Sequence, residues 1–133
     1  MFESLDYLYV PAPSPSIEAS IRYYVEVLGG TLRWKIHAFG AWVACIALSR
    51  EGPPVLLADH KPPSGPQLVY RVAAFDRTVA ELRARGWQPE AAPFEIPSGP
   101  CCSFRDPAGN QLAIYENRRP GLVQTFDGRF DRA

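Results

Sequence analysis

The chain has 133 residues, of which 47% are hydrophobic, enough for a single domain with a hydrophobic core. Fourteen basic and fourteen acidic residues give a formal net charge of zero, which provides no general attraction to nucleic acid or an anionic membrane. The longest apolar run is far shorter than the roughly 20 residues of a membrane-spanning helix, and the N-terminus lacks signal-peptide character. We therefore expect a cytoplasmic protein that binds neither nucleic acid nor membrane.

The first half of the chain predicts a strand, a helix and three further strands. Leu5–Val10 is the first strand, and Ser14 followed by a proline is a typical helix start. Apolar residues then recur at helical spacing until Gly29 ends the helix. The three strand-like runs that follow are separated by glycine-containing turns. These runs are Thr31–Phe39, Ala41–Leu48 and Pro54–Asp59.

The second half repeats this order after a proline-rich stretch at 61–66. Gln67–Ala73 predicts a strand, and Asp76 is the expected N-cap of a helix that closes at Gly86. Three extended runs follow: Trp87–Pro93, Pro100–Arg105 and Asn110–Glu116. The sequence thus predicts one domain over 1–133, with βαβββ modules at about 1–60 and 66–117 and a polar C-terminal extension at 118–133. A module of about 60 residues makes a weak core alone, so the two should pair.

Three stretches of these modules carry motifs of a known superfamily. Ile21–Gly30 closes the first helix with Leu-Gly-Gly, Val72–Gly86 spans the second helix, and Phe104–Glu116 contains the turn Arg-Asp-Pro-Ala-Gly-Asn. From about Leu5 to Glu116 the chain resembles the vicinal oxygen chelate superfamily of glyoxalases, bleomycin-resistance proteins and extradiol dioxygenases. The resemblance implies an α+β fold in which two paired βαβββ modules form a curled mixed sheet with a U-shaped cavity, with the helices outside.

Enzymes of this superfamily typically hold a divalent metal with four His, Gln or Glu side chains. Carried over by motif, the four positions fall on Tyr7, Leu57, Gln67 and Ala113. Leu57 and Ala113 have no donor atom, and Tyr7 would have to lose a proton whose pKa is ordinarily about 10. His37 and His60, the two histidines of the chain, form no recognisable metal motif. We therefore expect neither a metal nor a cofactor.

Strand alternation separates the two faces of the predicted sheet. Residues out of phase with the four former ligand positions are nearly all aliphatic, as on a face covered by helices. Residues in phase mix tyrosine, glutamine and arginine with apolar side chains, which is typical of a small-molecule site. The predicted ligand-binding residues are Tyr7, Tyr9, Leu57, Gln67, Arg71, Gln111, Ala113 and Tyr115. With one arginine among neutral residues, this face predicts a planar ligand that is neutral or weakly anionic.

The three cysteines predict no metal site and no disulfide. Cys45 lies in an apolar run and is expected to be buried. Cys101 and Cys102 are neighbours in a predicted strand, so their side chains should point to opposite faces.

The leading functional hypothesis is a metal-independent small-molecule binding protein of the glyoxalase/bleomycin-resistance type, sequestering an aromatic or antibiotic-like compound. Two enzymatic alternatives stay open: a metal-dependent glyoxalase-like lyase, isomerase or extradiol-type dioxygenase, and a metal-free enzyme that uses Tyr7. A cavity filled by the protein's own side chains is the alternative without a ligand. The resemblance also implies a homodimer.

Overall fold

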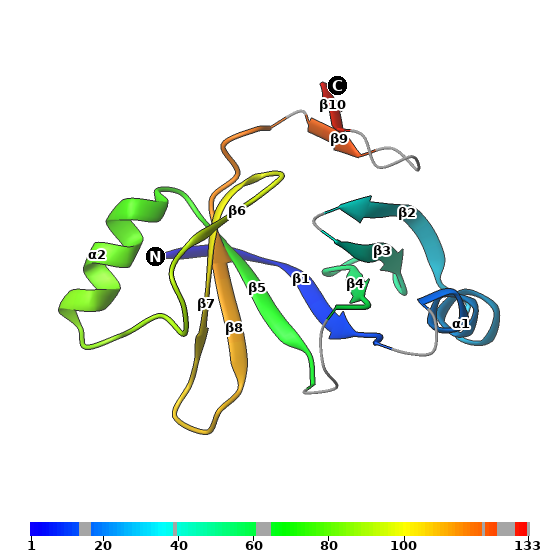
Figure 1. The fold of residues 1–133 in the computed structure, drawn as a ribbon, viewed down its shortest axis with the longest axis horizontal. Helices are drawn as coiled ribbons and strands as arrows, with labels where there is room; N and C mark the ends of the chain where they lie inside the picture. The colour runs from blue at the N-terminus through cyan, green and yellow to red at the C-terminus, as the bar shows by residue number, and fades with distance from the viewer. Residues whose placement is uncertain (14–16, 39, 61–64, 121, 125–129, 133) are drawn as a thin grey trace. The chain divides into compact units, whose positions relative to one another are not determined.

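The computed structural model describes residues 1–13, 17–38, 40–60, 65–120, 122–124 and 130–132 (Figure 1). The chain divides into two compact units. One, here called the α2 unit, contains Met1–Asp6 and Gln67–Gly121; the other, the α1 unit, contains Tyr7–Pro66 and Leu122–Ala133. Eight strands are hydrogen-bonded in the order β2-β3-β4-β1-β5-β8-β7-β6, and strand β1 (Phe2–Pro11) contributes residues to both units. No helix in the described part of the chain is long and apolar enough to cross a membrane.

The α1 unit has the predicted order of one helix and three strands after β1. Its elements are helix α1 (Ile17–Arg22), the π-helical turn η1 (Tyr23–Val27), β2 (Thr31–Ala38), β3 (Ala41–Ala47) and β4 (Val55–Ala58). Ser14, the expected helix cap, lies outside the described residues. Gly29 ends the helix with φ of 78°, a left-handed conformation that glycine adopts without steric penalty.

Strand pairing in the α1 unit is mixed. Strand β1 pairs in parallel with β4, whereas β4 pairs antiparallel with β3, and β3 antiparallel with β2. Apolar residues of α1 pack on one face of these strands. The buried cluster consists of Ala12, Ile17, Ile21, Ala44, Ile46, Val55 and Leu57. Burial of these side chains stabilises the packing of α1 on the sheet, and each of the larger ones contributes about 1.5–3 kcal/mol.

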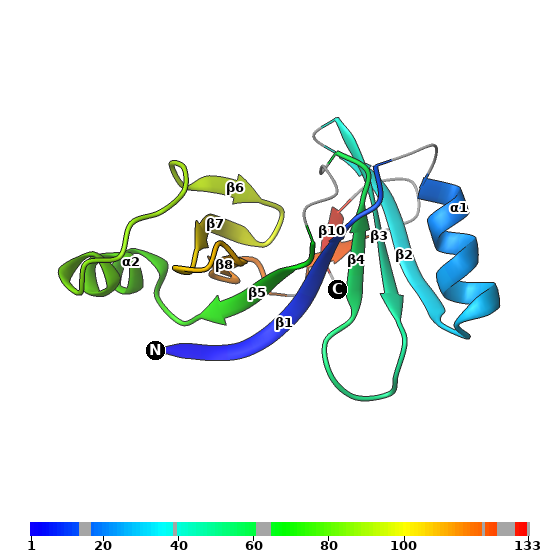
Figure 2. The same ribbon diagram turned by 90° about the horizontal axis from the view of Figure 1, so that it is seen from below.

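The α2 unit repeats this arrangement (Figure 2). Its elements are β5 (Gln67–Val72), α2 (Phe75–Ala84), β6 (Phe94–Ile96), β7 (Gly99–Arg105) and β8 (Gln111–Tyr115). Strand β5 pairs in parallel with β8, while β7 is antiparallel to both β8 and β6. Its buried cluster consists of Val72, Phe75, Cys102, Phe104 and Ile114, with Val79 and Leu82 of α2 packed against it. The predicted α+β class with two βαβββ modules is therefore confirmed.

Two local expectations were wrong. The extended run expected at 87–93 is not a strand; Trp87 instead packs edge-on against Phe104, with ring centroids 5.5 Å apart, and the strand begins at Phe94. Pro89 and Pro93 have no N–H to donate to a ladder, which disfavours a paired strand there. In addition, Asp76 does not cap α2, because the N-cap position is Ala74.

The C-terminal extension contains two short strands. Strand β9 (Leu122–Gln124) pairs antiparallel with β10 (Phe130–Arg132). They form a separate two-stranded sheet, whereas the sequence indicated only a polar extension over these residues.

Candidate functional site

The sheet of the α2 unit has one apolar and one polar face. Register places Val69 beside Ala113, and Arg71 beside Tyr115, on the face opposite the core cluster. The same register places Ser103 beside Ala113. This polar face comprises Gln67, Val69, Arg71, Cys101, Ser103, Gln111, Ala113 and Tyr115. The five predicted site residues of this half, Gln67, Arg71, Gln111, Ala113 and Tyr115, therefore share one face.

The donor atoms on the polar face do not fit a divalent metal. Gln67 is buried, and its Nε2 donates to Ser103 Oγ and to the Leu112 carbonyl, both at 3.1 Å. Ala113, across the ladder from Ser103, offers no donor. Among the described residues, no group of three His, Cys, Asp or Glu side chains lies close enough together to hold a metal ion. A hard dication requires several converging oxygen or nitrogen ligands, which Gln67 and Ala113 do not supply.

A polar network surrounds Arg71 at the other end of this face. Tyr115 Oη donates to Asp6 Oδ2, and Ser4 Oγ donates to Asp6 Oδ1 at 2.6 Å. Arg71 Nε lies 3.5 Å from Glu3 Oε1 and 3.8 Å from Asp6 Oδ2. Strand β1 thus brings two carboxylates to an arginine and a tyrosine that sequence reasoning had already selected.

Glu3 and Asp6 were missed because the expected first strand began at Leu5 and its site face was assigned from Tyr7 and Tyr9. Asp6 is out of phase with those tyrosines. However, β1 begins at Phe2, and its residues up to Asp6 belong to the α2 unit. The local sequence of a strand does not indicate which of its residues will contact side chains that are distant in the chain.

Three polar atoms among the described residues of the α2 unit are buried without a hydrogen bond. Arg71 Nε and Gln111 Oε1 lie on the polar face, whereas the third, Trp87 Nε1, belongs to a side chain packed against the core cluster beneath α2. Within the described part of the chain, no hydrogen bond reaches the remaining guanidinium nitrogens of Arg71 either, and its side chain is 42% exposed. A buried polar atom without a partner costs about 1–3 kcal/mol, so a donor for Gln111 and an acceptor for Arg71 would both be stabilising.

The predicted site residues of the α1 unit do not share one face. Val10 lies beside Leu57 in the register, and Leu57 is 1% exposed in the core cluster beneath α1. Tyr9 lies beside Leu56 instead. The prediction that Leu57 accompanies Tyr7 and Tyr9 was therefore wrong. The reason is that β4 reads Val-Leu-Leu-Ala, so its hydrophobicity does not alternate and its faces cannot be told apart.

Tyr9 contributes an aromatic contact within the α1 unit. Its ring lies 6.0 Å from that of His60, at an interplanar angle of 73°, an edge-to-face arrangement. Tyr7 and Tyr9 are both partly buried. Their roles in ligand binding stay predictions.

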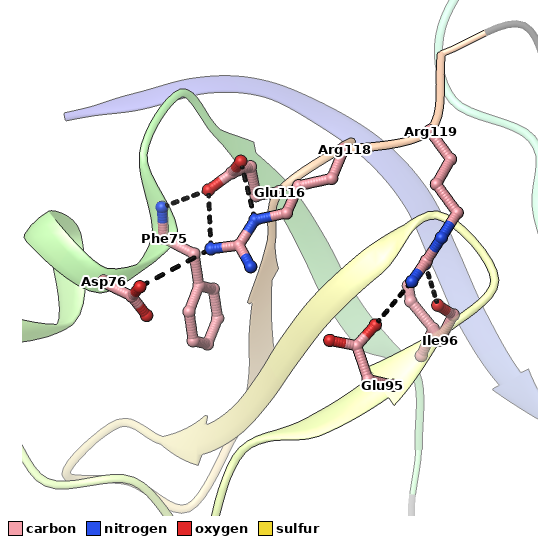
Figure 3. A network of polar contacts seen from close by, with 7 residues as sticks. All are labelled: Phe75, Asp76, Glu95, Ile96, Glu116, Arg118 and Arg119. Carbon is pink, nitrogen blue, oxygen red and sulfur yellow. Dashed lines mark hydrogen bonds and ion pairs between the residues drawn. The ribbon is translucent and has the colours of Figure 1, made fainter.

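A second polar network, distinct from the Arg71 cluster, joins the end of β8 to α2 (Figure 3). Glu116 Oε1 accepts a hydrogen bond from the Phe75 N–H at 2.7 Å, and Glu116 Oε2 accepts one from Arg118 Nε at 2.9 Å. Arg118 also lies 3.6 Å from Asp76, and Arg119 donates to the Pro97 carbonyl at 2.9 Å. The hydrogen bond from Arg118, followed by that from the Phe75 amide, lowers the pKa of Glu116.

The turn that carried the family resemblance is held by one carboxylate. Asp106 Oδ1 accepts hydrogen bonds from the backbone N–H groups of Ala108 at 3.0 Å and of Asn110 at 2.8 Å. Asp106 Oδ2 accepts a third from Asn110 Nδ2 at 2.9 Å. These bonds, that of the Asn110 side chain first, lower the pKa of Asp106. This turn joins β7 to β8, and the hydrogen bonds to Asp106 stabilise its conformation.

All three cysteines are free and buried. Cys102 lies in the core beneath α2, whereas Cys101 lies beside Tyr115 on the polar face, which confirms the expected opposite orientation. Burial raises the pKa of the Cys45 thiol to about 11, and burial also raises the pKa of Cys102. Both groups are thus protonated thiols at neutral pH.

Comparison with solved structures reveals the same fold in other proteins. Methylmalonyl-CoA epimerase from Mycobacterium tuberculosis aligns with a TM-score of 0.70 at 18% identity, covering 86% of this chain and 88% of that one. Hypothetical protein BH1468 from Bacillus halodurans C-125 aligns with a TM-score of 0.72 at 16% identity, covering 87% and 95%. A Streptomyces coelicolor methylmalonyl-CoA epimerase in complex with 2-nitronate-propionyl-CoA aligns at 0.67 and 14% identity, covering 89% and 99%. At such identities the similarity establishes the fold alone.

Sequence comparison gives a more direct assignment. No curated protein matches the chain significantly. Residues 7–114, however, match the family described as the Glyoxalase/Bleomycin resistance protein/Dioxygenase superfamily, and this region includes both helices and the Asp106 turn. The matched region exceeds half of the sequence and agrees with the duplicated βαβββ order. The chain therefore belongs to the Glyoxalase/Bleomycin resistance protein/Dioxygenase superfamily.

Proposed function

We propose that this protein binds a small organic molecule, without a metal, through the polar face of its α2 unit. The observation that carries the proposal is that two buried atoms without hydrogen bonds, Arg71 Nε and Gln111 Oε1, lie on this polar face. One is a donor and the other an acceptor, and both lie on a face whose remaining residues are apolar or already hydrogen-bonded. A planar ligand that offers complementary polar groups fits this combination. Sequestration of an aromatic or antibiotic-like compound is the role that we assign to such binding.

A metal-independent site is favoured over a metal centre by the chemistry of the side chains present. Gln67 directs its amide N–H groups to two acceptors of the protein, and Ala113 has no donor atom. Two of the proteins with the same fold are methylmalonyl-CoA epimerases, one of them in complex with 2-nitronate-propionyl-CoA, but each shares less than one fifth of its residues with this chain. Epimerase activity is therefore a competing hypothesis for this chain, and it is tested by an assay with methylmalonyl-CoA.

Ligand screening by thermal shift tests the proposal directly. A ligand present at 100 times its Kd should raise the free energy of unfolding by about 2.7 kcal/mol. We expect some planar aromatic metabolites or antibiotics in the panel to stabilise the protein in this way. The replacements Arg71→Gln and Gln111→Leu should reduce the affinity of the protein for these compounds. Arg77→Gln and Gln88→Leu are matched controls, because both of these residues are exposed in the same unit. Equal losses in site and control variants would contradict the assignment of the polar face.

The enzymatic alternatives are tested with the same protein. Elemental analysis after purification without chelator should detect no stoichiometric divalent metal. Incubation with methylmalonyl-CoA in deuterated water should leave its α-hydrogen unexchanged. Metal at one equivalent per chain, or deuterium exchange above the protein-free rate, would favour an enzyme. Loss of that exchange in Tyr7→Phe would favour a metal-free enzyme that uses Tyr7.

We further propose that the protein is a cytoplasmic homodimer, as the family resemblance implies. Light scattering after size-exclusion chromatography measures the mass in solution, which for a dimer is twice the 14.8 kDa of one chain. Cell fractionation measures the location. A monomer at all accessible concentrations would contradict the first part, and recovery outside the cytoplasm the second.

A further inference from the structure

The charges around Arg71 are unbalanced. Two carboxylates, those of Glu3 and Asp6, lie within 4.0 Å of one guanidinium, so the group of three residues carries a net charge of −1 when all are ionised. Ser4 and Tyr115 add hydrogen bonds to Asp6 but no charge. Strand alternation placed one charged residue, the arginine, on this face, and this pattern predicted a ligand that is neutral or weakly anionic. The carboxylates from β1 reverse the sign of the local charge.

The guanidinium of Arg71 can still donate hydrogen bonds, although the two nearby carboxylates offset its positive charge. Its Nε is buried beside both carboxylates at distances beyond a hydrogen bond, and no hydrogen bond reaches its guanidinium within the described residues. A ligand acceptor placed on the free nitrogens therefore gains a charge-assisted hydrogen bond. A ligand carboxylate in that place would also become the third anion around one cation, and like charges at such separations repel.

The two carboxylates differ in how strongly they act. The Asp6 side chain is 20% exposed and is held by Ser4 and Tyr115, whereas the Glu3 side chain is 49% exposed. Solvent screens an exposed charge more than a partly buried one. Asp6 is also fixed in position, so its repulsion of an incoming anion cannot be relieved by rotation of the side chain.

Building on the proposed function, we infer that the ligand presents an uncharged carbonyl oxygen, of the amide or ketone class, to Arg71. Asp6 and, more weakly, Glu3 are then specificity-determining residues that disfavour carboxylates. They act on the ligand through charge and through the orientation of Arg71. The expected class of ligands is therefore neutral planar carbonyl compounds, and weakly anionic compounds are no longer part of it.

A pair of isosteric probes tests this inference: naphthalene carboxamide and the corresponding naphthoate, titrated calorimetrically into the purified protein. We expect wild type to favour the carboxamide about tenfold, which corresponds to about 1.4 kcal/mol. Asp6→Asn keeps one acceptor oxygen and places an NH2 donor at the other position, where the hydroxyl oxygen of Ser4 or Tyr115 can accept from it. The variant removes the charge, so it should shift the ratio toward naphthoate. Glu3→Gln should shift it less, and Glu81→Gln, at an exposed position on α2, should leave it unchanged.

Salt supplies a readout that a purely structural role would not change. Raising the ionic strength should reduce the carboxamide preference of wild type, because the discrimination is electrostatic, and should have little effect in the Asp6→Asn, Glu3→Gln double variant. If Asp6→Asn does not fold, the exposed position of Glu3 makes Glu3→Gln the usable variant.

The outcomes separate the two proposals. If wild type binds naphthoate as tightly as the carboxamide, or more tightly, the inference about Asp6 and Glu3 is overturned while small-molecule binding stands. If the preference persists undiminished in the double variant, the carboxylates are not its cause. If neither these probes nor any compound of the thermal-shift panel binds wild type, the proposed function itself fails, and the inference with it.

Discussion

Replacing Glu116 removes the side chain that caps α2 from outside the helix. The N-cap residue Ala74 offers no side-chain acceptor, and Glu116 Oε1 bonds the Phe75 N–H from 41 positions along the chain. Loss of a helix cap costs about 0.5–2 kcal/mol, and loss of a negative charge near the N-terminus about 0.3–1 kcal/mol. The partner Arg118 is 45% exposed, so solvent screening keeps the contribution of their ion pair small.

We therefore expect Glu116→Ala to lower the free energy of unfolding by about 1–2 kcal/mol at pH 7. Glu116→Gln retains an acceptor for Phe75 and should lose about half as much, roughly 0.5–1 kcal/mol. Urea denaturation followed by circular dichroism measures both values. Glu81→Gln is the matched control, since Glu81 is exposed on α2.

The pH dependence gives this prediction a sign. The pKa of Glu116 is lower in the folded protein than in the unfolded chain. Its stabilising contribution is therefore fully present above the unfolded pKa, about 4.3, and is lost as pH falls through the lower, folded value. The difference between wild type and Glu116→Gln should shrink below about pH 4. A difference that is constant from pH 7 to pH 3, or wild-type stability in Glu116→Ala, would refute the reasoning.

Three further substitutions or measurements test the packing. Gly99→Ala should destabilise by at least about 1–3 kcal/mol, because its Cβ would lie 2.3 Å from the Glu116 carbonyl oxygen; unchanged urea denaturation would contradict this close approach. Leu57→Ala should lower the free energy of unfolding by about 2–5 kcal/mol and leave the ligand selectivity unchanged, since Leu57 lies in the core beneath α1. A changed ratio of carboxamide to carboxylate affinity would indicate that Leu57 belongs to the binding site. Cys45, with a pKa raised to about 11, should resist a thiol reagent at pH 8 until urea unfolds the protein, whereas rapid labelling of the native chain would show it to be accessible.

Much of the architecture could be predicted from local signals. Alternating and helical hydrophobic periods appear twice in the same order, and the structure contains both βαβββ units. In the α2 unit, alternation was also sufficient to place Gln67, Arg71 and Tyr115 on one face, because the other face of β5 and β8 is aliphatic except for Tyr70. The absence of a donor at Ala113 is a property of residue type, which requires no coordinates.

Other features depended on contacts between residues distant in the chain. The face of Leu57 could not be read from a strand in which every residue is apolar, and only its register beside Val10 decided it. The cap of α2 is supplied by Glu116, so a search for a local cap selected Asp76 instead.

By itself, then, the sequence determined the duplicated order of elements, the superfamily and the donor-poor residue set at the former metal positions, because all three depend on residue type and short-range spacing. Only the tertiary structure decided the charge around Arg71. Glu3 and Asp6 are more than 60 positions away from it in the chain, and they reach it because β1 and β5 are hydrogen-bonded neighbours in the sheet. Electrostatic energy depends on distance through space, and the spacing of residues along a sequence does not specify that distance.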